Sequence, residues 1–140
     1  DKGFLTPEQC LSLSKYCYNN NIPVFVDSKK TDLSCFENCI IKINQHEYEK
    51  ITKYPENLDL IVTLGADGVL YKGDIYKTDE VEVFDVCGAG DVFISSLVYM
   101  YLKHGDMIKA IEFANKCAAY SVTKFGTYVL TKEDVDDLCV

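Results

Sequence analysis

Short apolar runs alternate with longer segments of helical spacing in the first half of the chain. Thr6 to about Asn20 begins with Thr-Pro-Glu-Gln, a capping-box pattern with proline at the first helical position, and predicts a helix. Val24 to Asp27, Cys39 to Ile43 and Leu60 to Leu64 predict buried strands, and a helix is expected to begin near Gln45. This alternation is typical of α/β proteins.

The second half of the chain is predicted to contain a hairpin, a further strand and three helices. Val69 to Tyr71 and Ile75 to Lys77 flank Gly73-Asp74, which predicts a β-hairpin. Val81 to Phe84 is expected to be a strand that leads into a tight turn and a helix. That helix has Phe93, Leu97 and Met100 or Tyr101 at helical spacing and is expected to stop near Lys103-His104-Gly105.

Two more helices are predicted beyond Gly105, where His104 is interpreted as a capping residue rather than a catalyst. One should run from about Asp106 to Phe125 and end at Gly126, and the last should begin at Thr131. The stripe expected on the longer helix consists of Ile108, Ile111, Ala114 or Asn115, Ala118 and Val122. We found no repeat or linker, so the pattern predicts one α/β layer structure with a mainly parallel sheet.

The segment Asp85-Val86-Cys87-Gly88-Ala89-Gly90-Asp91 is the most informative part of the chain. Gly88 and Gly90 allow unusual backbone angles and close approach of a ligand, and the first helical turn leaves amides free to bind an anion. Asp91 would repel a phosphate unless it is needed as the base for a hydroxyl that attacks that phosphate. A kinase active site explains both features.

Other interpretations of this turn differ in strength. Gly-x-Gly before an acidic residue is also ordinary helix capping, and the local pattern alone leaves that interpretation open. A dinucleotide fingerprint would need glycine where Phe93 stands, and no Gly-Lys-Ser/Thr of a Walker loop follows.

Four motifs, in the same order along the chain, resemble those of the ribokinase-like (PfkB) carbohydrate kinases. Asp85 to Asp91 is similar to their signature Asp-Thr-Thr-Gly-Ala-Gly-Asp, and Asn44-Gln45-His46-Glu47 to their Asn-x-x-Glu motif. Thr63 to Gly68 is similar to their Thr-x-Gly-x-x-Gly strand end, and Asn115 to Thr127 to their closing helix and Gly-Thr turn. The resemblance implies the ribokinase-like three-layer α/β fold, with a mainly parallel sheet and flanking helices.

The branch of the family is indicated by further segments. Val24 to Lys29, Thr31-Asp32 and Gly126 to Thr131 are most similar to heptose-phosphate kinases, the kinase portion of the enzymes that make ADP-heptose. Val86 and Cys87 replace the usual hydroxyl residues of the signature, which leaves cation dependence and catalytic speed open.

The resemblance implies ATP-dependent phosphorylation of a sugar or sugar-phosphate hydroxyl, such as that of a heptose 7-phosphate. Asp91 would be the catalytic base, and the amides of Gly88, Ala89 and Gly90 would stabilise the transferred group. The implied nucleotide-binding residues are Asn44, Gln45, His46, Glu47, Thr63, Gly65 and Asn115. Asn44 and Glu47 would organise Mg²⁺, partly through water, and Asp85 belongs to a monovalent-cation site in several relatives.

Each of these residues also has an ordinary structural explanation. Asn44 and Glu47 fit a helix cap and a first-turn acid, and Thr63 and Gly65 fit a strand end and a turn. Asn115 fits a core-edge amide that bonds to backbone. Independently of the family, ligands of α/β sheets gather beyond the carboxyl ends of strands, and such ends are predicted to hold Asn44, Glu47, Thr63, Gly65 and Gly88 to Asp91.

The resemblance covers residues 1–140 but corresponds only to the carboxyl-terminal half of such a kinase. The opening Asp1-Lys2-Gly3-Phe4-Leu5, without Met, is similar to an internal family segment, so we interpret the chain as a fragment. The missing half would hold the lid, most sugar contacts and the surface through which relatives often form homodimers. The fragment alone is expected to be inactive.

Composition excludes several function classes. The net charge is −8 and all 14 basic residues are Lys, so neither a nucleic-acid groove nor arginine clamps on phosphate are expected. No apolar run is long enough to span a bilayer. Seven cysteines without a Cys-x-x-Cys pair do not support a zinc site; Cys10, Cys17 and Cys117 are expected to be buried thiols in a reducing cytoplasm.

Two alternatives to a heptose-phosphate kinase remain open. Another kinase of the family, acting on ribose, fructose or a nucleoside, would differ mainly in the missing half. A non-catalytic nucleotide-binding module could keep the fold, and in such a module Asp91→Asn should leave function unaffected.

Overall fold

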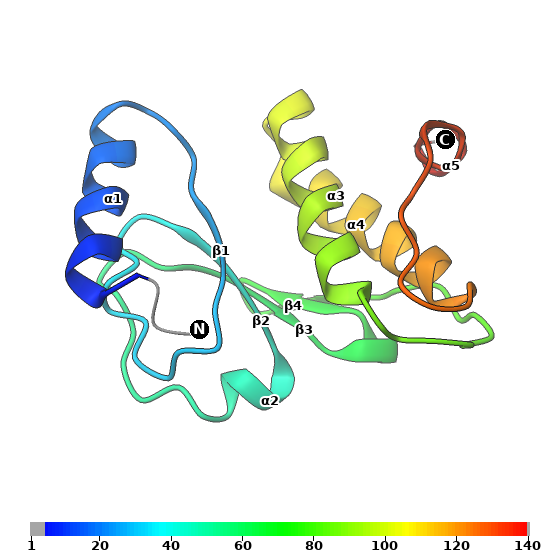
Figure 1. Cartoon of the computed structure of the whole chain (residues 1–140), viewed down its shortest axis with the longest axis horizontal. Helices are drawn as coiled ribbons and strands as arrows, with labels where there is room; N and C mark the ends of the chain where they lie inside the picture. Colours follow the sequence, from blue (N-terminus) through cyan, green and yellow to red (C-terminus); the bar gives the residue numbers. More distant parts are fainter. Residues whose placement is uncertain (1–4, 140) are drawn as a thin grey trace. The chain divides into compact units, whose positions relative to one another are not determined.

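A computed structural model describes residues 5–139, so the opening residues Asp1 to Phe4 lie outside the described part of the chain (Figure 1). The chain forms two compact units. The first extends to Leu64 and includes Leu70–Asp74, and the second consists of Gly65–Val69 and the residues from Ile75 onward.

The first unit alternates helices and parallel strands as the sequence predicts. Its elements in chain order are α1 (Pro7–Asn19), β1 (Phe25–Asp27), β2 (Ile40–Asn44), α2 (Gln45–Tyr48) and β3 (Asp59–Thr63). β1 pairs in parallel with β2, and β2 in parallel with β3. The mainly parallel arrangement expected for this half of the chain is confirmed.

The predicted capping box at the start of α1 is present. Thr6 Oγ1 accepts a hydrogen bond from the Gln9 amide at 3.2 Å, and Gln9 Oε1 accepts one from the Thr6 amide at 2.9 Å. These two bonds satisfy amides that the first turn of a helix leaves without partners. Proline at the next position fits because it has no amide hydrogen to satisfy.

One face of the first three strands forms the core of this unit. Ile41, Ile43 and Val62 are buried in a cluster that includes Cys10 of α1 and Leu33. Because side chains alternate along a strand, Lys42 lies on the opposite face of β2.

The predicted hairpin is confirmed, but its turn and second strand begin one residue earlier than the expected Gly73-Asp74 and Ile75 to Lys77. A single 3₁₀ turn, Gly65–Asp67, precedes β4 (Val69–Tyr71) and β5 (Asp74–Tyr76). Lys72 and Gly73 have φ angles of 52° and 92°, as a tight two-residue hairpin turn requires. The strand order β1-β2-β3-β4-β5 follows the chain order.

The second unit contains the paired helices α3 (Ala89–His104) and α4 (Met107–Val122), followed by α5 (Lys132–Leu138). α3 and α4 pack against each other, as Figure 1 shows, and bury Leu97, Ile111 and Cys117. α3 ends at His104 and is capped by Gly105, whose φ is 68° and whose amide donates to the Tyr101 carbonyl at 2.7 Å. The glycine cap predicted after His104 is therefore confirmed.

Three predictions for the second unit are wrong. Val81 to Phe84 forms no strand. The Phe84 amide donates to the Val122 carbonyl at the end of α4, and the side chains of Val81, Val83 and Phe84 are exposed. α4 ends at Val122 rather than near Phe125. Ile108 is 46% exposed, because the buried face of α4 is centred on Ile111, Ala114 and Cys117 instead.

The cysteines of the described residues are all free thiols. Cys10 and Cys117 are buried as expected, whereas Cys17 is only half-buried. Burial raises the pKa of the Cys117 thiol, and it does the same for Cys35 and Cys39. Within residues 5–139 no helix has the length and apolar character needed to cross a membrane.

Candidate active site

The turn from Asp85 to Asp91 opens directly into α3. Gly88 is the residue before the helix and has φ 80° and ψ −2°, the left-handed conformation that favours glycine. A Cβ atom at this position would lie 2.8 Å from the Thr127 methyl carbon. The turn therefore requires glycine both for its backbone angles and for the approach of Thr127.

The start of α3 has no side-chain cap. Among the described residues no acceptor is present for the Gly90 and Asp91 amides. The Ala89 amide differs, because it donates to the Val86 carbonyl at 3.2 Å. The helix thus presents two unpaired first-turn amides and one amide that is already bonded.

Asp85 ties this turn to the loop after α4. Its Oδ1 accepts from the Cys87 amide at 2.8 Å and its Oδ2 from the Gly126 amide at 3.1 Å. Cys87 Sγ lies 3.4 Å from Thr127 Oγ1. Both oxygens of Asp85 therefore act as structural acceptors that fix the shape of the turn.

Asp91 is exposed in the first turn of α3. Its carboxylate makes no hydrogen bond or ion pair with any residue in the described range, while its carbonyl accepts from Ser95 Oγ at 2.7 Å. Asp91 and Gly88 line a largely apolar cavity of about 420 Å³ together with the 127–130 loop. The carboxylate is available to accept a proton from a group bound there.

Asn44 and Glu47 form a reciprocal cap at the start of α2. Asn44 Oδ1 accepts from the Glu47 amide at 2.8 Å, and Glu47 Oε2 accepts from the Asn44 amide at 2.9 Å. Glu47 Oε1 is the carboxylate oxygen outside this cap. Residues 5–139 contain no group of three or more His, Cys, Asp or Glu side chains that could hold a metal ion. The free carboxylate oxygen of Glu47 fits a water-mediated contact with a metal ion.

Gln45 and His46, between the two capping residues, are exposed. His46 Nε2 lies 2.6 Å from Lys50 Nζ, one helical turn further on. This arrangement places a cation beside the imidazole, and the nitrogen that faces the ammonium acts as the acceptor.

Thr63 and Gly65 follow the third strand. Thr63 is the register partner of Asn44, and its Oγ1 donates to the Ile43 carbonyl at 3.4 Å. Gly65 begins the 3₁₀ turn with φ at 64°. The parallel pairing thus brings Thr63 beside Asn44 at the carboxyl ends of their strands, as the sequence led us to expect.

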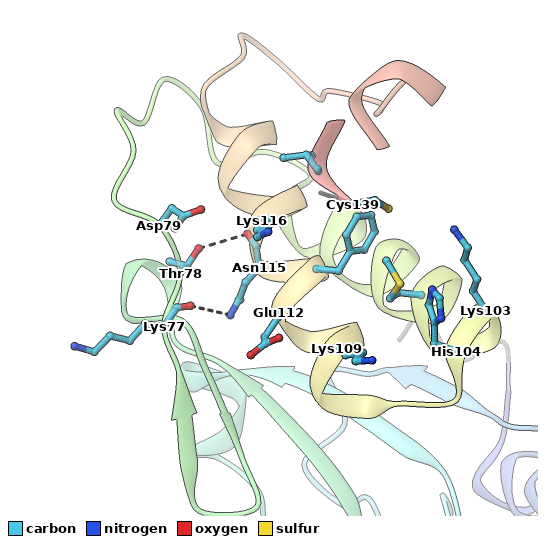
Figure 2. A pocket seen from close by; sticks show the side chains of 13 residues that line it. Lys77, Thr78, Asp79, Lys103, His104, Lys109, Glu112, Asn115, Lys116 and Cys139 are labelled. Atoms are coloured by element: carbon cyan, nitrogen blue, oxygen red, sulfur yellow. Dashed lines mark hydrogen bonds between the residues drawn. The ribbon is translucent and has the colours of Figure 1, made fainter. Parts of the chain in front are cut away.

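Asn115 is buried in α4 and bonds to backbone. The side-chain Nδ2 of Asn115 donates to the Tyr76 carbonyl at 2.9 Å and to the Lys77 carbonyl at 3.5 Å. The backbone carbonyl of Asn115 accepts from Thr78 Oγ1 at 3.4 Å. Figure 2 shows the bonds of Asn115 with Lys77 and Thr78 at one side of a cavity of about 590 Å³, with the Lys77 ammonium pointing away from Asn115. The Asn115 side chain is thus a structural link between α4 and the hairpin.

The strongest electrostatic perturbation in the second unit lies at the start of α5. Asp134 Oδ2 accepts from the Thr131 amide at 2.7 Å, from Thr131 Oγ1 at 2.8 Å and from the Tyr128 hydroxyl at 2.9 Å. These bonds hold the pKa of Asp134 well below its usual range. The bond to Asp134 raises the pKa of Tyr128 to about 12.

The predicted site residues thus fall into two groups. Asn44 to Glu47 and Thr63 belong to the first unit, and Gly65, Gly88 to Asp91 and Asn115 belong to the second. Sequence reasoning missed Thr127 as the neighbour of Gly88 and the pair formed by Lys42 and Asp27. A lysine between two isoleucines in an apolar strand was the signal for that pair.

Comparison with known proteins identifies the family. The model of the pfkB family carbohydrate kinases matches residues 6–134, which is most of the chain. The chain therefore belongs to the pfkB family of carbohydrate kinases.

Relatives and solved structures agree with this assignment. The bifunctional protein HldE of Campylobacter concisus is 31% identical over 98% of this chain and 34% of its own length. The ribokinase of Thermotoga maritima has a TM-score of 0.77 at 22% identity over 94% of this chain and 52% of its own. The ribokinase of Arabidopsis thaliana, solved with ribose and ATP, has a TM-score of 0.79 at 17% identity over 96% and 53%. The chain thus spans about a third of HldE and half of the ribokinases, and the ribokinase-like fold is confirmed.

Proposed function

We propose that this chain is the nucleotide and catalytic-base part of a kinase that transfers the γ-phosphoryl group of ATP to a sugar hydroxyl. The observation that supports this most is the uncapped start of α3, where two amides without partners lie beside the exposed Asp91. Amides at a helix start favour an anion, and a neighbouring carboxylate suits a proton acceptor. Capping alone would not require both.

In this mechanism the Gly90 and Asp91 amides donate to the oxygens of the transferred group, where negative charge is redistributed in the transition state. Asp91 accepts the hydroxyl proton as the nucleophile approaches the phosphorus. Ala89 contributes through backbone shape, because its amide is bonded to Val86. Gly88 allows the turn and the helix to meet.

The nucleotide contacts of the first unit are proposed from the family resemblance. Asn44, Glu47 and Thr63 lie at the ends of neighbouring parallel strands, where ligands of α/β sheets bind. Mg²⁺ bound there would neutralise phosphate charge, and Glu47 Oε1 would orient it through water. Gln45, His46 and Gly65 would lie along the nucleotide, and Asn115 would support the adenine site by holding the hairpin.

For the acceptor we propose a heptose phosphate. Support comes from the match to HldE along nearly the whole chain and from the segment Val24 to Lys29, which is similar to that branch. The remaining part of a kinase-length protein would supply the lid, the sugar contacts and a homodimer surface. The ribokinases among the solved neighbours favour a pentose kinase as the second candidate.

Calorimetry tests this proposal. The parent chain should bind Mg·ATP, and Gly90→Val should lose that binding because the branched side chain covers the open helix start. Asp91→Asn is the matched control, since it should keep nucleotide while removing the base. Circular dichroism establishes that all three proteins are folded. A folded parent that binds no Mg·ATP would contradict the proposed site.

A further inference from the structure

Among the residues that the structure describes, Lys42 is the one buried residue with a charged side chain. It is 6% exposed, whereas the other buried polar residues are Ser14, Ser96, Asn115 and Ser121. Its Nζ lies 2.8 Å from Asp27 Oδ2 on the neighbouring strand β1. The Asp27 side chain is 35% exposed, so the pair has one covered and one solvated partner.

Strand register places this pair directly beside the proposed nucleotide site. Asp27 pairs with Lys42, and Asn44 pairs with Thr63. Side chains two residues apart on a strand share a face and lie about 7 Å apart along it. Lys42 is therefore on the same face as Asn44, within the length of a lysine side chain, and opposite the core of Ile41 and Ile43.

The stability of the strand does not explain the lysine. Burying an ammonium group costs solvation free energy, and a buried ion pair is often replaced by apolar residues without loss of stability. The neighbours Ile40, Ile41 and Ile43 show that this strand accepts isoleucine on both faces. A function that needs a positive charge is a better reason for Lys42.

Charge composition shows what that function needs. The chain has net charge −8 and no arginine, so the basic side chains that this part of the protein can offer to a polyphosphate are lysines. A lysine held at the carboxyl ends of parallel strands is placed to meet such a ligand.

We infer that Lys42 binds the polyphosphate of the nucleotide. Asp27 is a positioning residue that binds the Lys42 ammonium in the free protein and is replaced by phosphate when the nucleotide binds. The inference rests on the proposed function and assigns a further binding residue to that site. Phosphate oxygens carry more charge than one carboxylate, and Asp27 can be hydrated once Lys42 turns from it.

This exchange predicts effects of opposite sign. Lys42→Met should weaken Mg·ATP binding about tenfold to a hundredfold, the loss of a hydrogen bond to a charged group, and should leave adenosine binding unchanged. Asp27→Asn should strengthen Mg·ATP binding, because the competitor for the ammonium has lost its charge. In the Lys42→Met background, Asp27→Asn should have no effect, since the two act through each other.

The experiment is calorimetry of the parent and these three variants with Mg·ATP and with adenosine. Lys15→Met is the matched control, because it removes the same charge from an exposed position on α1. Urea unfolding of each variant measures stability separately from affinity.

The outcomes are distinguishable. A folded parent that binds neither ligand contradicts the proposed function itself. If the parent binds Mg·ATP and Lys42→Met binds it equally well, the inference about Lys42 alone is overturned. Weaker binding and lower stability in both single variants would mean that the pair is purely structural, which also overturns the inference.

Discussion

The helix starts of α2 and α3 both follow a motif that the sequence singles out, but they are built differently. At α2, Asn44 and Glu47 bond each other's amides, so the start is satisfied by its own side chains. At α3, Gly88 offers no side chain, and the Gly90 and Asp91 amides meet no acceptor among the described residues. The first start is closed, and the second is open.

This difference teaches where a ligand is needed. A closed start stabilises a helix without help, whereas an open start leaves amides that only solvent or a ligand can satisfy. Local rules of folding tend to be broken at functional sites. The open start of α3 is therefore the better candidate for chemistry, and the following predictions test that contrast.

Substitution of Asp91 should have the largest effect. If Asp91 accepts the hydroxyl proton, Asp91→Asn in the kinase should lower kcat about 100-fold to 10,000-fold and leave Mg·ATP affinity unchanged. Steady-state phosphoryl transfer to a heptose phosphate measures the first, and calorimetry the second. Asp137→Asn, an exposed acid in α5, is the control for lost charge. Full turnover by Asp91→Asn would contradict the assignment of catalysis to the start of α3.

Substitution of Gly88 should have the next largest effect. Gly88→Ala places a side chain at positive φ, which costs about 1–2 kcal/mol, and adds a contact with the Thr127 methyl group. Gly105→Ala is the matched control, since φ is 68° there and nothing lies within 4 Å of the added carbon. Urea unfolding should show the larger loss for Gly88→Ala. Thr127→Ser, which removes that methyl group, should restore part of it.

Substitution of Asn44 should have a smaller effect that falls on stability. Asn44→Ala removes the acceptor for the Glu47 amide and should cost about 1 kcal/mol in urea unfolding. Asn44→Asp keeps an acceptor at the same place and should remain near the parent. A loss of Mg·ATP binding in Asn44→Ala without a loss of stability would show that this residue serves the ligand more than the helix.

Acidification should have the smallest effect and tests a third helix start, at α5. Thr131 and Asp134 cap each other, and their bonds lower the pKa of Asp134. The stability from this carboxylate is present above its ordinary pKa of 3.8 and is lost as the pH falls below it. Thermal unfolding of the parent and Asp134→Asn should therefore converge in acid.

The same network has an alkaline limit. The pKa of Tyr128 is raised to about 12, so its stabilising bond is present below the ordinary pKa of 10.0 and is lost as the pH rises toward 12. Tyr128→Phe should remove that pH dependence.

Most of the fold could be predicted because its local signals are strong. Thr6 and Gln9 form the capping box that begins α1, Gly105 caps the end of α3, and the hairpin turn contains Gly73. The prediction of a strand at Val81 to Phe84 was wrong because apolar alternation does not guarantee a neighbouring strand. Among the described residues, the backbone hydrogen bond of this segment runs from the Phe84 amide to the Val122 carbonyl, which lies at the end of α4.

The site could be predicted only at the level of motifs. Spacing pointed to Gly88, Asp91 and Asn44, but the bond from Ala89 to Val86 and the contact with Thr127 depend on the turn geometry. Thr127 lies far from Gly88 in the sequence, so no local pattern could reveal that contact. The link between Lys42 and Asp27 likewise depends on strand register.

The distribution of free thiols provides a site for attaching a fluorescent label. Cys87 and Cys139 are exposed, whereas Cys10, Cys35, Cys39 and Cys117 are buried. A thiol-reactive fluorophore added to the folded Cys139→Ser variant should thus label Cys87 ahead of the buried cysteines. The dye would lie beside the open start of α3, where a change in its emission would report directly on the arrival of a ligand.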